Sequence, residues 1–209
     1  MNQSNNIRIL VADDHAIVRQ GLVSLLEQEP DVTVVAQASD GQEAVAMFRQ
    51  YQPDVTLMDL RMSQMDGVTA ITTICGEFAG AQIVVLTTYD GEEDIYRGLQ
   101  AGAKGYLLKD ADPNELLTAI RTVVGGNKYI PPTVGAKLAE RMSSPQLSER
   151  ELEVIRLIVA GNSNQKISAI LHISESTVKF HVNNILTKLG ANDRTQAAIT
   201  ALKRGIASL

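Results

Sequence analysis

Short β-branched runs alternate with amphipathic segments from Ile7 to Val124, and this alternation constrains the fold more than any other feature of the chain. The runs that predict strands are Ile7–Ala12, Val32–Ala38, Val55–Met58, Gln82–Thr87 and Gly105–Leu108. The segments with helical periodicity are His15–Gln28, Gln42–Tyr51, Val68–Phe78, Glu92–Ala101 and Pro113–Val124. Strands that alternate with helices are typical of a parallel sheet with helices on both faces. We therefore expect an α/β domain over residues 6–126 with a five-stranded parallel sheet.

The alternation ends at Gly125-Gly126-Asn127, and no strand pattern follows it. Residues 127–146 contain prolines and serines and predict a linker, with a short helix over Val134–Met142. Residues 147–209 predict an all-α domain of four helices. These helices are Glu149–Ala160, Asn164–Leu171, Glu175–Leu189 and Asp193–Ile206. The first of them begins with Ser148 and Glu151 at the spacing of a capping box.

Charge is divided unevenly between the two halves. The whole chain has a formal net charge of −5. Residues 1–126 contain 8 basic and 18 acidic residues, whereas residues 127–209 contain 11 basic and 6 acidic ones. A basic half favours a polyanion as its partner, the alternative being a chance distribution of surface charge.

Composition excludes several other classes of protein. The single cysteine, Cys75, allows no intrachain disulfide, and one cysteine with three histidines argues against a structural zinc site. The polar segment Met1–Asn6 lacks the features of a secretion signal, and no apolar stretch approaches the roughly 20 residues of a membrane span. We therefore expect a cytoplasmic protein with no membrane partner.

Polar side chains stand at the carboxyl ends of the predicted strands. Asp13 and Asp14 follow the first strand and Asp59 follows the third, while Thr87 ends the fourth and Lys109 follows the fifth. In an open parallel sheet, ligands bind at these ends near the point where the strand order reverses. Each residue taken singly has a structural explanation, such as a helix cap for Asp14. Taken together they predict one site.

This set of side chains fits phosphoryl transfer. The carboxylate oxygens of Asp14 and Asp59 are hard ligands for Mg²⁺. A carboxylate is also a nucleophile that forms an aspartyl phosphate, and the ammonium of Lys109 offsets charge on the phosphoryl oxygens. A Mg²⁺-dependent phosphatase is the rival interpretation, but its usual Asp-x-Asp motif needs an acid where Arg61 stands.

Four ordered motifs resemble the receiver domains of response regulators. They are Val11-Ala12-Asp13-Asp14-His15, Asp54-Val55-Thr56-Leu57-Met58-Asp59, Leu86-Thr87 and Gly105-Tyr106-Leu107-Leu108-Lys109. The resemblance implies a flavodoxin-like fold with Asp59 as the phosphoacceptor. It implies that Mg²⁺ is held by Asp13, Asp14, Asp59 and the backbone carbonyl of Arg61. It also implies that Thr87 and Tyr106 form a switch pair and that Lys109 contacts the phosphate.

The resemblance carries two further expectations. Phosphorylation is expected to draw Thr87 toward a phosphoryl oxygen and to turn Tyr106 inward. Ser63 stands where the family usually has proline, so the loop that contains it is expected to be more mobile. This departure bears on the lifetime of the phosphoryl group and leaves the identity of the phosphoacceptor unchanged.

The segment Glu175–Leu189 divides by helical period into two faces. Its apolar face holds Val178, Val182, Ile185, Leu186 and Leu189. Its other face holds Ser176, Lys179, Phe180, Asn183 and Thr187. The second face carries side chains that reach bases and phosphates in DNA. A solvated helix face explains the same pattern, except that Phe180 is unusual on such a face.

The last 60 or so residues resemble a LuxR-type helix-turn-helix. The motifs are Leu147-Ser148-Glu149-Arg150-Glu151, Asn164-Gln165-Lys166-Ile167, Ile173-Ser174-Glu175-Ser176-Thr177-Val178-Lys179 and Lys188-Leu189-Gly190. A receiver followed by this module is the NarL/FixJ class of response regulators. The resemblance implies DNA contacts from Glu175, Ser176, Thr177, Lys179, Phe180, Asn183 and Lys188. It implies a dimer contact through Asp193, Thr195, Ala198 and Leu202, and packing or capping roles for His172 and His181.

The two resemblances together imply a response regulator of a two-component system, which is a transcription regulator and not an enzyme. A histidine kinase or a small phosphodonor would phosphorylate Asp59. The phosphorylated chain would form a homodimer on double-stranded DNA, with RNA polymerase as a further partner. Two alternatives stay open: a regulator that works without phosphorylation, which the full set of site residues disfavours, and a sigma-factor promoter-reading module, which the receiver disfavours.

Overall fold

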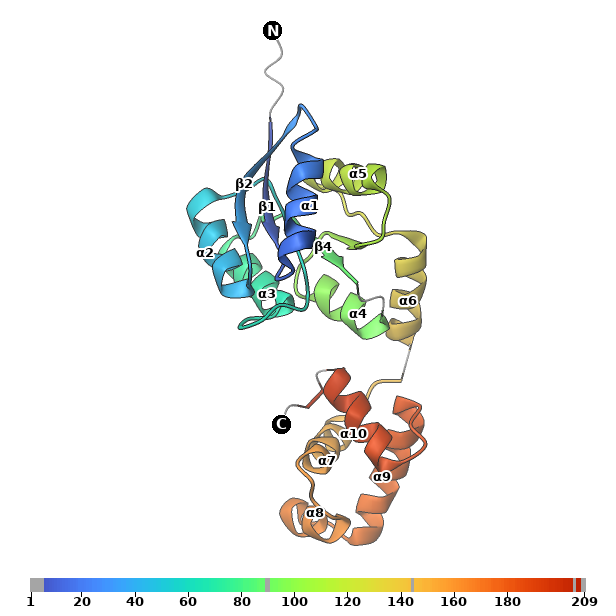
Figure 1. Cartoon of the computed structure of the whole chain (residues 1–209). Coiled ribbons are helices and arrows are strands. Elements are labelled where there is room, and N and C mark those ends of the chain that lie inside the picture. Colours follow the sequence, from blue (N-terminus) through green and yellow to red (C-terminus); the bar gives the residue numbers. More distant parts are fainter. Residues whose placement is uncertain (1–5, 89–90, 144, 205, 208–209) are drawn as a thin grey trace. The chain divides into compact units, whose positions relative to one another are not determined.

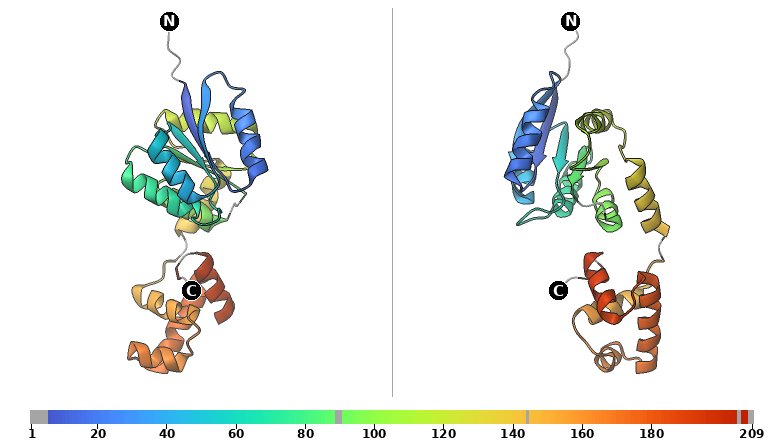
Figure 2. Two further views of the ribbon diagram at one scale, coloured as in Figure 1. Left: turned by 60° about the vertical axis from the view of Figure 1, so that its left-hand side comes forward. Right: turned by 45° about the vertical axis from the view of Figure 1, so that its right-hand side comes forward.

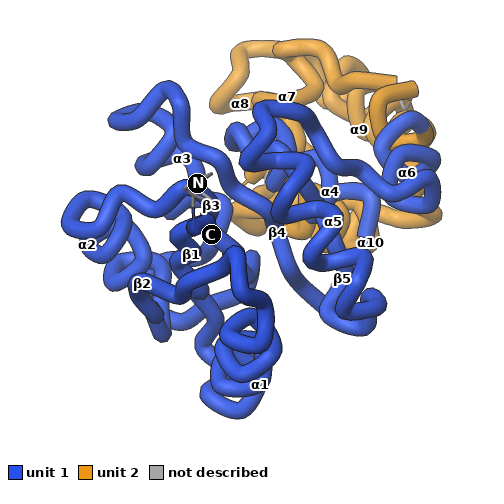
Figure 3. The backbone as a smooth tube through the Cα atoms, turned by 90° about the horizontal axis from the view of Figure 1, so that it is seen from above, with its two compact units in different colours: residues 1–139 blue, residues 140–209 orange. Residues whose placement is uncertain are grey.

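A computed structural model of the chain describes residues 6–88, 91–143, 145–204 and 206–207. Residues 1–5, in the segment where we expect no secretion signal, lie outside this part. The chain divides into two compact units, Met1–Ala139 and Glu140–Leu209 (Figure 1, Figure 3). None of the helices over the described ranges is long and apolar enough to cross a membrane.

The first unit is built on a five-stranded sheet in which all neighbouring strands run parallel (Figure 1). The strands are β1 (Ile7–Ala12), β2 (Val32–Ala38), β3 (Val55–Met58), β4 (Ile83–Thr87) and β5 (Gly105–Leu108). Their order is β2-β1-β3-β4-β5. The order reverses at β1 and β3, as in flavodoxin-like folds, and the carboxyl ends of these strands border the crevice where ligands bind. The predicted parallel sheet is confirmed.

Helices cover both faces of this sheet (Figure 2). They are α1 (Ala16–Leu26), α2 (Gly41–Tyr51), α3 (Gly67–Glu77), α4 (Glu92–Gln100) and α5 (Pro113–Val124). Helices α2, α3 and α4 bury Phe48, Ile71 and Ile95 against one face. Helices α1 and α5 bury Leu26 and Ile120 against the other. Every helix expected in this unit is present, because each has an apolar stripe that the sheet covers.

The connection between β3 and α3 passes very close to Asp59. The N–H of Gly67 donates to the carbonyl of Leu60 at 2.9 Å. A β-carbon at Gly67 would lie 2.0 Å from the carbonyl oxygen of Asp59, closer than any real contact. Asp66 caps α3 by accepting a hydrogen bond from the N–H of Thr69 at 2.7 Å. The backbone can therefore pass this close to Asp59 only because position 67 is glycine.

The boundary between the units differs from the linker predicted over residues 127–146. The N–H of Tyr129 donates to the carbonyl of Lys104 at 2.9 Å, and its carbonyl accepts from the N–H of Tyr106 at 3.1 Å. Helix α6 (Pro132–Ser143) follows, and its Val134 is buried in the same cluster as Tyr106. The segment up to Ala139 therefore belongs to the first unit, since its apolar side chains find a partner surface that local composition does not reveal.

The second unit contains the four expected helices. They are α7 (Glu149–Val159), α8 (Asn164–Leu171), α9 (Glu175–Leu189) and α10 (Arg194–Lys203). Their buried core includes Val154, Ile155, Val178 and Ile185. Ser148 and Glu151 form the predicted capping box of α7. His172 ends α8 in the left-handed conformation (φ 53°), so the predicted capping role of this histidine agrees with its geometry.

We expect Gly67→Ala to lower the free energy of unfolding of the first unit by about 3 kcal/mol, because the new methyl group meets backbone that cannot move aside. The matched control is Gly76→Ala in the same helix, where an added β-carbon meets nothing within 4 Å. That control should stabilise the chain by up to about 1 kcal/mol through helix propensity. Urea unfolding measures both, and equal stabilities of the two variants would contradict the close approach at Gly67.

Candidate functional site

Three strand ends bring Asp13, Asp59 and Lys109 into direct contact. Asp13 follows β1, Asp59 follows β3 and Lys109 follows β5. The Lys109 Nζ lies 2.7 Å from Asp13 Oδ2 and 2.7 Å from Asp59 Oδ2. The N–H of Asp59 donates to the carbonyl of Ala12 at 2.9 Å, which ties the ends of β1 and β3 together. The parallel sheet thus assembles the residues that the sequence places far apart.

The two carboxylates of this contact are buried. Asp13 is 1% exposed and Asp59 is 3% exposed. Burial by itself would lower the pKa of Lys109, but the hydrogen bonds from its ammonium to Asp13 and Asp59 outweigh that effect and hold the pKa above its usual value. Lys109 is therefore a cation at neutral pH. A buried charge of this kind needs the two carboxylates, because an unpaired ammonium is costly to remove from water.

Asp14 and His15 complete the cluster at the carboxyl end of β1. One donor atom from each of Asp13, Asp14, His15 and Asp59 lies within 4.8 Å of the others. The Asp14 Oδ1 is buried and has no hydrogen-bond partner within the described ranges; His15 Nδ1 lies 2.8 Å away without forming a hydrogen bond. A buried carboxylate oxygen that accepts no hydrogen bond, beside two further carboxylates, fits a divalent cation that prefers oxygen ligands, such as Mg²⁺.

The loop after Asp59 contains Arg61 and Ser63. The N–H of Arg61 lies 3.4 Å from Asp59 Oδ1, and its guanidinium lies 3.4 Å from Asp94 of α4. Ser63 is exposed, and the next residue, Gln64, turns the loop with a left-handed φ of 65°. The roles of the Arg61 carbonyl and of Ser63 stay predictions.

The residues expected to form the switch pair are both buried. Thr87 and Tyr106 have no exposed surface. We expected Tyr106 to turn inward on phosphorylation, but the structure already holds it in the core. Gly98 of α4 lies next to the ring, since an added β-carbon there would be in ordinary contact with Tyr106 Cε2 at 3.6 Å.

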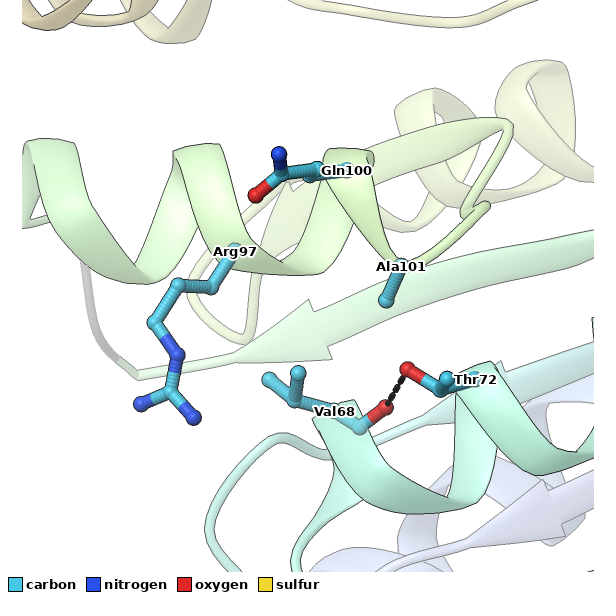
Figure 4. A pocket seen from close by; sticks show the side chains of 5 residues that line it. All are labelled: Val68, Thr72, Arg97, Gln100 and Ala101. Atoms are coloured by element: carbon cyan, nitrogen blue, oxygen red, sulfur yellow. Dashed lines mark hydrogen bonds between the residues drawn. The ribbon is translucent and has the colours of Figure 1, made fainter. Parts of the chain in front are cut away.

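A separate groove of about 290 Å³ lies between α3 and α4 (Figure 4). Its lining consists of Val68, Thr72, Arg97, Gln100 and Ala101. None of the clustered carboxylates lines it, and the Thr72 hydroxyl is already bonded to the carbonyl of Val68 at 2.8 Å. The chemistry of this unit therefore belongs to the carboxylate cluster and not to the groove.

Helix α9 presents the side chains expected to face DNA. Lys179 and Asn183 are exposed, and Phe180 is 61% exposed. The Ser174 hydroxyl caps the helix by accepting from the N–H of Thr177 at 3.1 Å. The hydroxyl of Ser176 lies 2.7 Å from this cap and that of Thr177 lies 2.8 Å from it.

The first turn of α9 therefore also stabilises its own helix. The hydroxyls that we expected to contact DNA there, those of Ser176 and Thr177, belong to the capping network around Ser174. Glu175 is exposed in the same turn, where a carboxylate favours the positive end of the helix dipole.

Lys188, a residue expected to contact DNA, also forms an ion pair within its own unit, and its DNA contact stays a prediction. Its Nζ lies 2.7 Å from Glu151 Oε2, and Glu151 is 3% exposed. Burial would raise the pKa of Glu151, but hydrogen bonds from Lys188 and Ser148 outweigh it and hold this pKa below its usual value. Since the folded-state pKa is depressed, the stabilisation from the pair is fully present above the unfolded pKa of about 4.3, and it is lost as pH falls from there through the lower folded-state pKa.

Two arginines that the sequence did not single out hold the ends of α8. Arg150 donates to the carbonyl of Leu171 at 2.9 Å. Arg194 donates to the Asn164 side chain at 2.9 Å and to the carbonyl of Asn162. No local pattern predicts these contacts, because each joins residues more than 20 positions apart.

The residues expected to form a dimer contact on α10 have mixed surroundings. Asp193 caps the helix by accepting from the N–H of Gln196 at 2.8 Å. Ala198 and Leu202 are partly buried against the core of their own unit, so part of their surface is already covered there, and the dimer contact stays a prediction. Thr195 is exposed, and so is Ile199, an apolar residue that the sequence reading missed.

Comparison with known proteins agrees with this geometry. Residues 9–121 match the model of the response regulator receiver domain, and residues 145–201 match that of the luxR family of bacterial regulatory proteins. The transcriptional regulatory protein LiaR of Bacillus subtilis is 41% identical, over 93% of this chain and 96% of LiaR. The response regulator VraR of Staphylococcus aureus is 39% identical, over 96% of this chain and 98% of VraR. A solved structure of two RcsB dimers bound to two parallel DNAs is similar with a TM-score of 0.75 and 29% identity, over 96% of this chain and 99% of that one.

We expect Lys188→Ala to destabilise the second unit by about 2–3 kcal/mol, because it leaves the buried carboxylate of Glu151 without its partner. The control is Lys179→Ala on the same helix, which removes an exposed lysine and should change stability by less than about 0.5 kcal/mol. Thermal unfolding at pH 7 measures both. A Lys188→Ala variant as stable as the control would show that the ion pair with Glu151 adds nothing to the stability of this unit.

Proposed function

We propose a mechanism from one premise: the chain belongs to the response regulators that join a receiver domain to a LuxR-type helix-turn-helix. It is a transcription regulator of a two-component system, as its relatives are. In the mechanism, phosphorylation of Asp59 controls sequence-specific DNA binding. The observation that carries the proposal is the contact of Lys109 with both Asp13 and Asp59, each at 2.7 Å, at three strand ends.

Asp59 is the nucleophile. One of its carboxylate oxygens attacks the phosphorus of a phosphohistidine on a partner kinase, or of a small phosphodonor, and the bond to the donor breaks. Lys109 then contacts a phosphoryl oxygen and offsets its charge. Asp13, Asp14, Asp59 and the Arg61 carbonyl would hold Mg²⁺. When bound, this ion supplies positive charge that reduces the repulsion between the carboxylates and the phosphoryl oxygens.

The receiver transmits the change through residues next to the site. Thr87 stands at the end of β4, within reach of the backbone of Lys109, whose N–H donates to the Thr87 carbonyl at 2.9 Å. A phosphoryl group on Asp59 adds acceptor oxygens that Thr87 and Lys109 share. The resulting shift biases a two-state equilibrium of the receiver toward the conformation with Tyr106 packed inward, which is the position it has in this structure. The active receiver forms the homodimer.

The second unit reads DNA with α9 in the major groove. Lys179, Phe180 and Asn183 face the bases, and Phe180 is suited to a thymine methyl group. A single helix-turn-helix contacts few bases, so two copies bind half-sites about one helical turn apart. The dimers of the similar protein RcsB on DNA support this arrangement. Because its partner is DNA, we propose that the protein acts in the cytoplasm, with RNA polymerase as a further partner.

We expect a small phosphodonor with Mg²⁺ to add one phosphate to the chain, and Asp59→Asn to abolish the addition, as measured by intact mass. EDTA should block the reaction in the parent, because the carboxylates repel a phosphoryl dianion without the charge of the metal. Asp54→Asn is the matched control, since Asp54 lies on the opposite end of β3 and bonds to the N–H of Arg8 at 2.8 Å. Phosphate that persists in Asp59→Asn would assign the nucleophile elsewhere.

We expect Lys179→Ala to weaken binding to a cognate duplex by about 1–3 kcal/mol and to relax the preference at one position in each half-site. Fluorescence anisotropy of the phosphorylated full chain over a salt series, on a cognate and a scrambled duplex, measures this. Lys128→Ala in the first unit removes the same charge away from α9 and should leave specificity unchanged. Equal weakening on both duplexes would make Lys179 a phosphate contact, and base reading would then belong to Phe180 or Asn183.

A further inference from the structure

His15 occupies the N-cap of α1 but does not cap it. The caps of seven other helices are aspartates or serines whose side chains accept a hydrogen bond from the first turn: Asp40, Asp66, Asp112, Ser148, Ser163, Ser174 and Asp193. His15 makes no such bond. Its ring nitrogen Nδ1 instead lies 2.8 Å from Asp14 Oδ1 and 3.5 Å from Asp13 Oδ1. Helix capping therefore does not explain where this imidazole points.

The donor spacings match those around one metal ion. Neighbouring ligand atoms on a six-coordinate ion with bonds of about 2.1 Å are roughly 3 Å apart. The separations of His15 Nδ1 from the two carboxylate oxygens bracket this value. The nearer oxygen, Asp14 Oδ1, is also the buried atom that has no hydrogen-bond partner in the described part of the chain. The His15 side chain is 69% exposed, so packing does not fix it elsewhere.

We propose that His15 is a metal-selecting residue, which adds an imidazole nitrogen to the carboxylate site and makes it prefer divalent transition metals over Mg²⁺. The inference rests on the proposed function, because it takes the carboxylate cluster as the cation site. Imidazole is a good ligand for zinc, nickel and iron, whereas carboxylate, carbonyl and water suit Mg²⁺. Mg²⁺ gives up its waters reluctantly and gains little from the nitrogen.

The test compares the binding of three ions to the full chain by isothermal titration calorimetry at pH 7.5: Mg²⁺, Mn²⁺ and Ni²⁺. His15→Ala should weaken Ni²⁺ binding by roughly tenfold or more, as the loss of a metal-site residue commonly does. It should weaken Mn²⁺ less, in line with the lower affinity of Mn²⁺ for nitrogen-containing sites, and should leave Mg²⁺ unchanged. His172→Ala is the matched control, because it removes another exposed imidazole from the second unit and should alter none of the three affinities.

The competing explanation is a charge contact between a protonated His15 and Asp14. In that case His15→Ala would change the three affinities alike, or would raise all of them, and either result would overturn the proposal. Circular dichroism verifies the fold of the variant, which loses no capping bond. Asp59→Asn distinguishes a failure of the proposed role of His15 from a failure of the proposed cation site. If it weakens all three ions while His15→Ala changes none, the carboxylate cation site stands and the role of His15 falls. If it leaves Mg²⁺ binding unchanged, the proposed cation site itself falls.

Discussion

The ammonium of Lys109 between two buried carboxylates is the interaction on which the first unit depends. Asp13 and Asp59 are almost fully buried, and like charges at such short range destabilise each other unless a cation lies between them. The sheet order places the ends of β1 and β3 next to each other, and Lys109 reaches them from the end of β5. Any group added to Asp59 must therefore change the partner of Lys109, and this makes the site a sensor of its own covalent state.

Strand β5 connects this ion pair to the segment that leads out of the first unit. Lys109 follows the strand, Tyr106 lies within it, and the N–H of Tyr106 donates to the carbonyl of Tyr129. Helix α6 begins soon afterward, with Val134 in the same buried cluster as Tyr106. A rearrangement at the end of β5 therefore acts directly on the backbone and side chains that contact this strand at the start of α6. This coupling is physical contact within one unit.

The sequence predicts most of the fold and the centre of the site, because both depend on regular patterns. Alternating periodicity gave the strands β1, β2, β3 and β5 with their observed ends, and the carboxyl ends of parallel strands necessarily meet. The contacts that the sequence does not predict have one physical cause, which is packing between residues far apart in the sequence. Lys188 lies on a basic helix by composition, yet its partner Glu151 is 37 positions away. Val134 lies in a proline-rich stretch, yet the sheet buries it.

The same long-range contacts reduce the number of basic side chains in the second unit that are available to bind phosphates. Arg150, Arg194 and Lys188 hold backbone carbonyls, an amide and a buried carboxylate, so these cations are part of the scaffold. The net positive charge of this half therefore overstates the number of side chains that meet phosphates. Fewer phosphate contacts in each copy mean weaker non-specific binding and a shallower dependence on salt. In the proposed mechanism, specific binding then depends on base contacts from α9 and on the pairing of two copies, so a receiver that controls pairing would also control transcription.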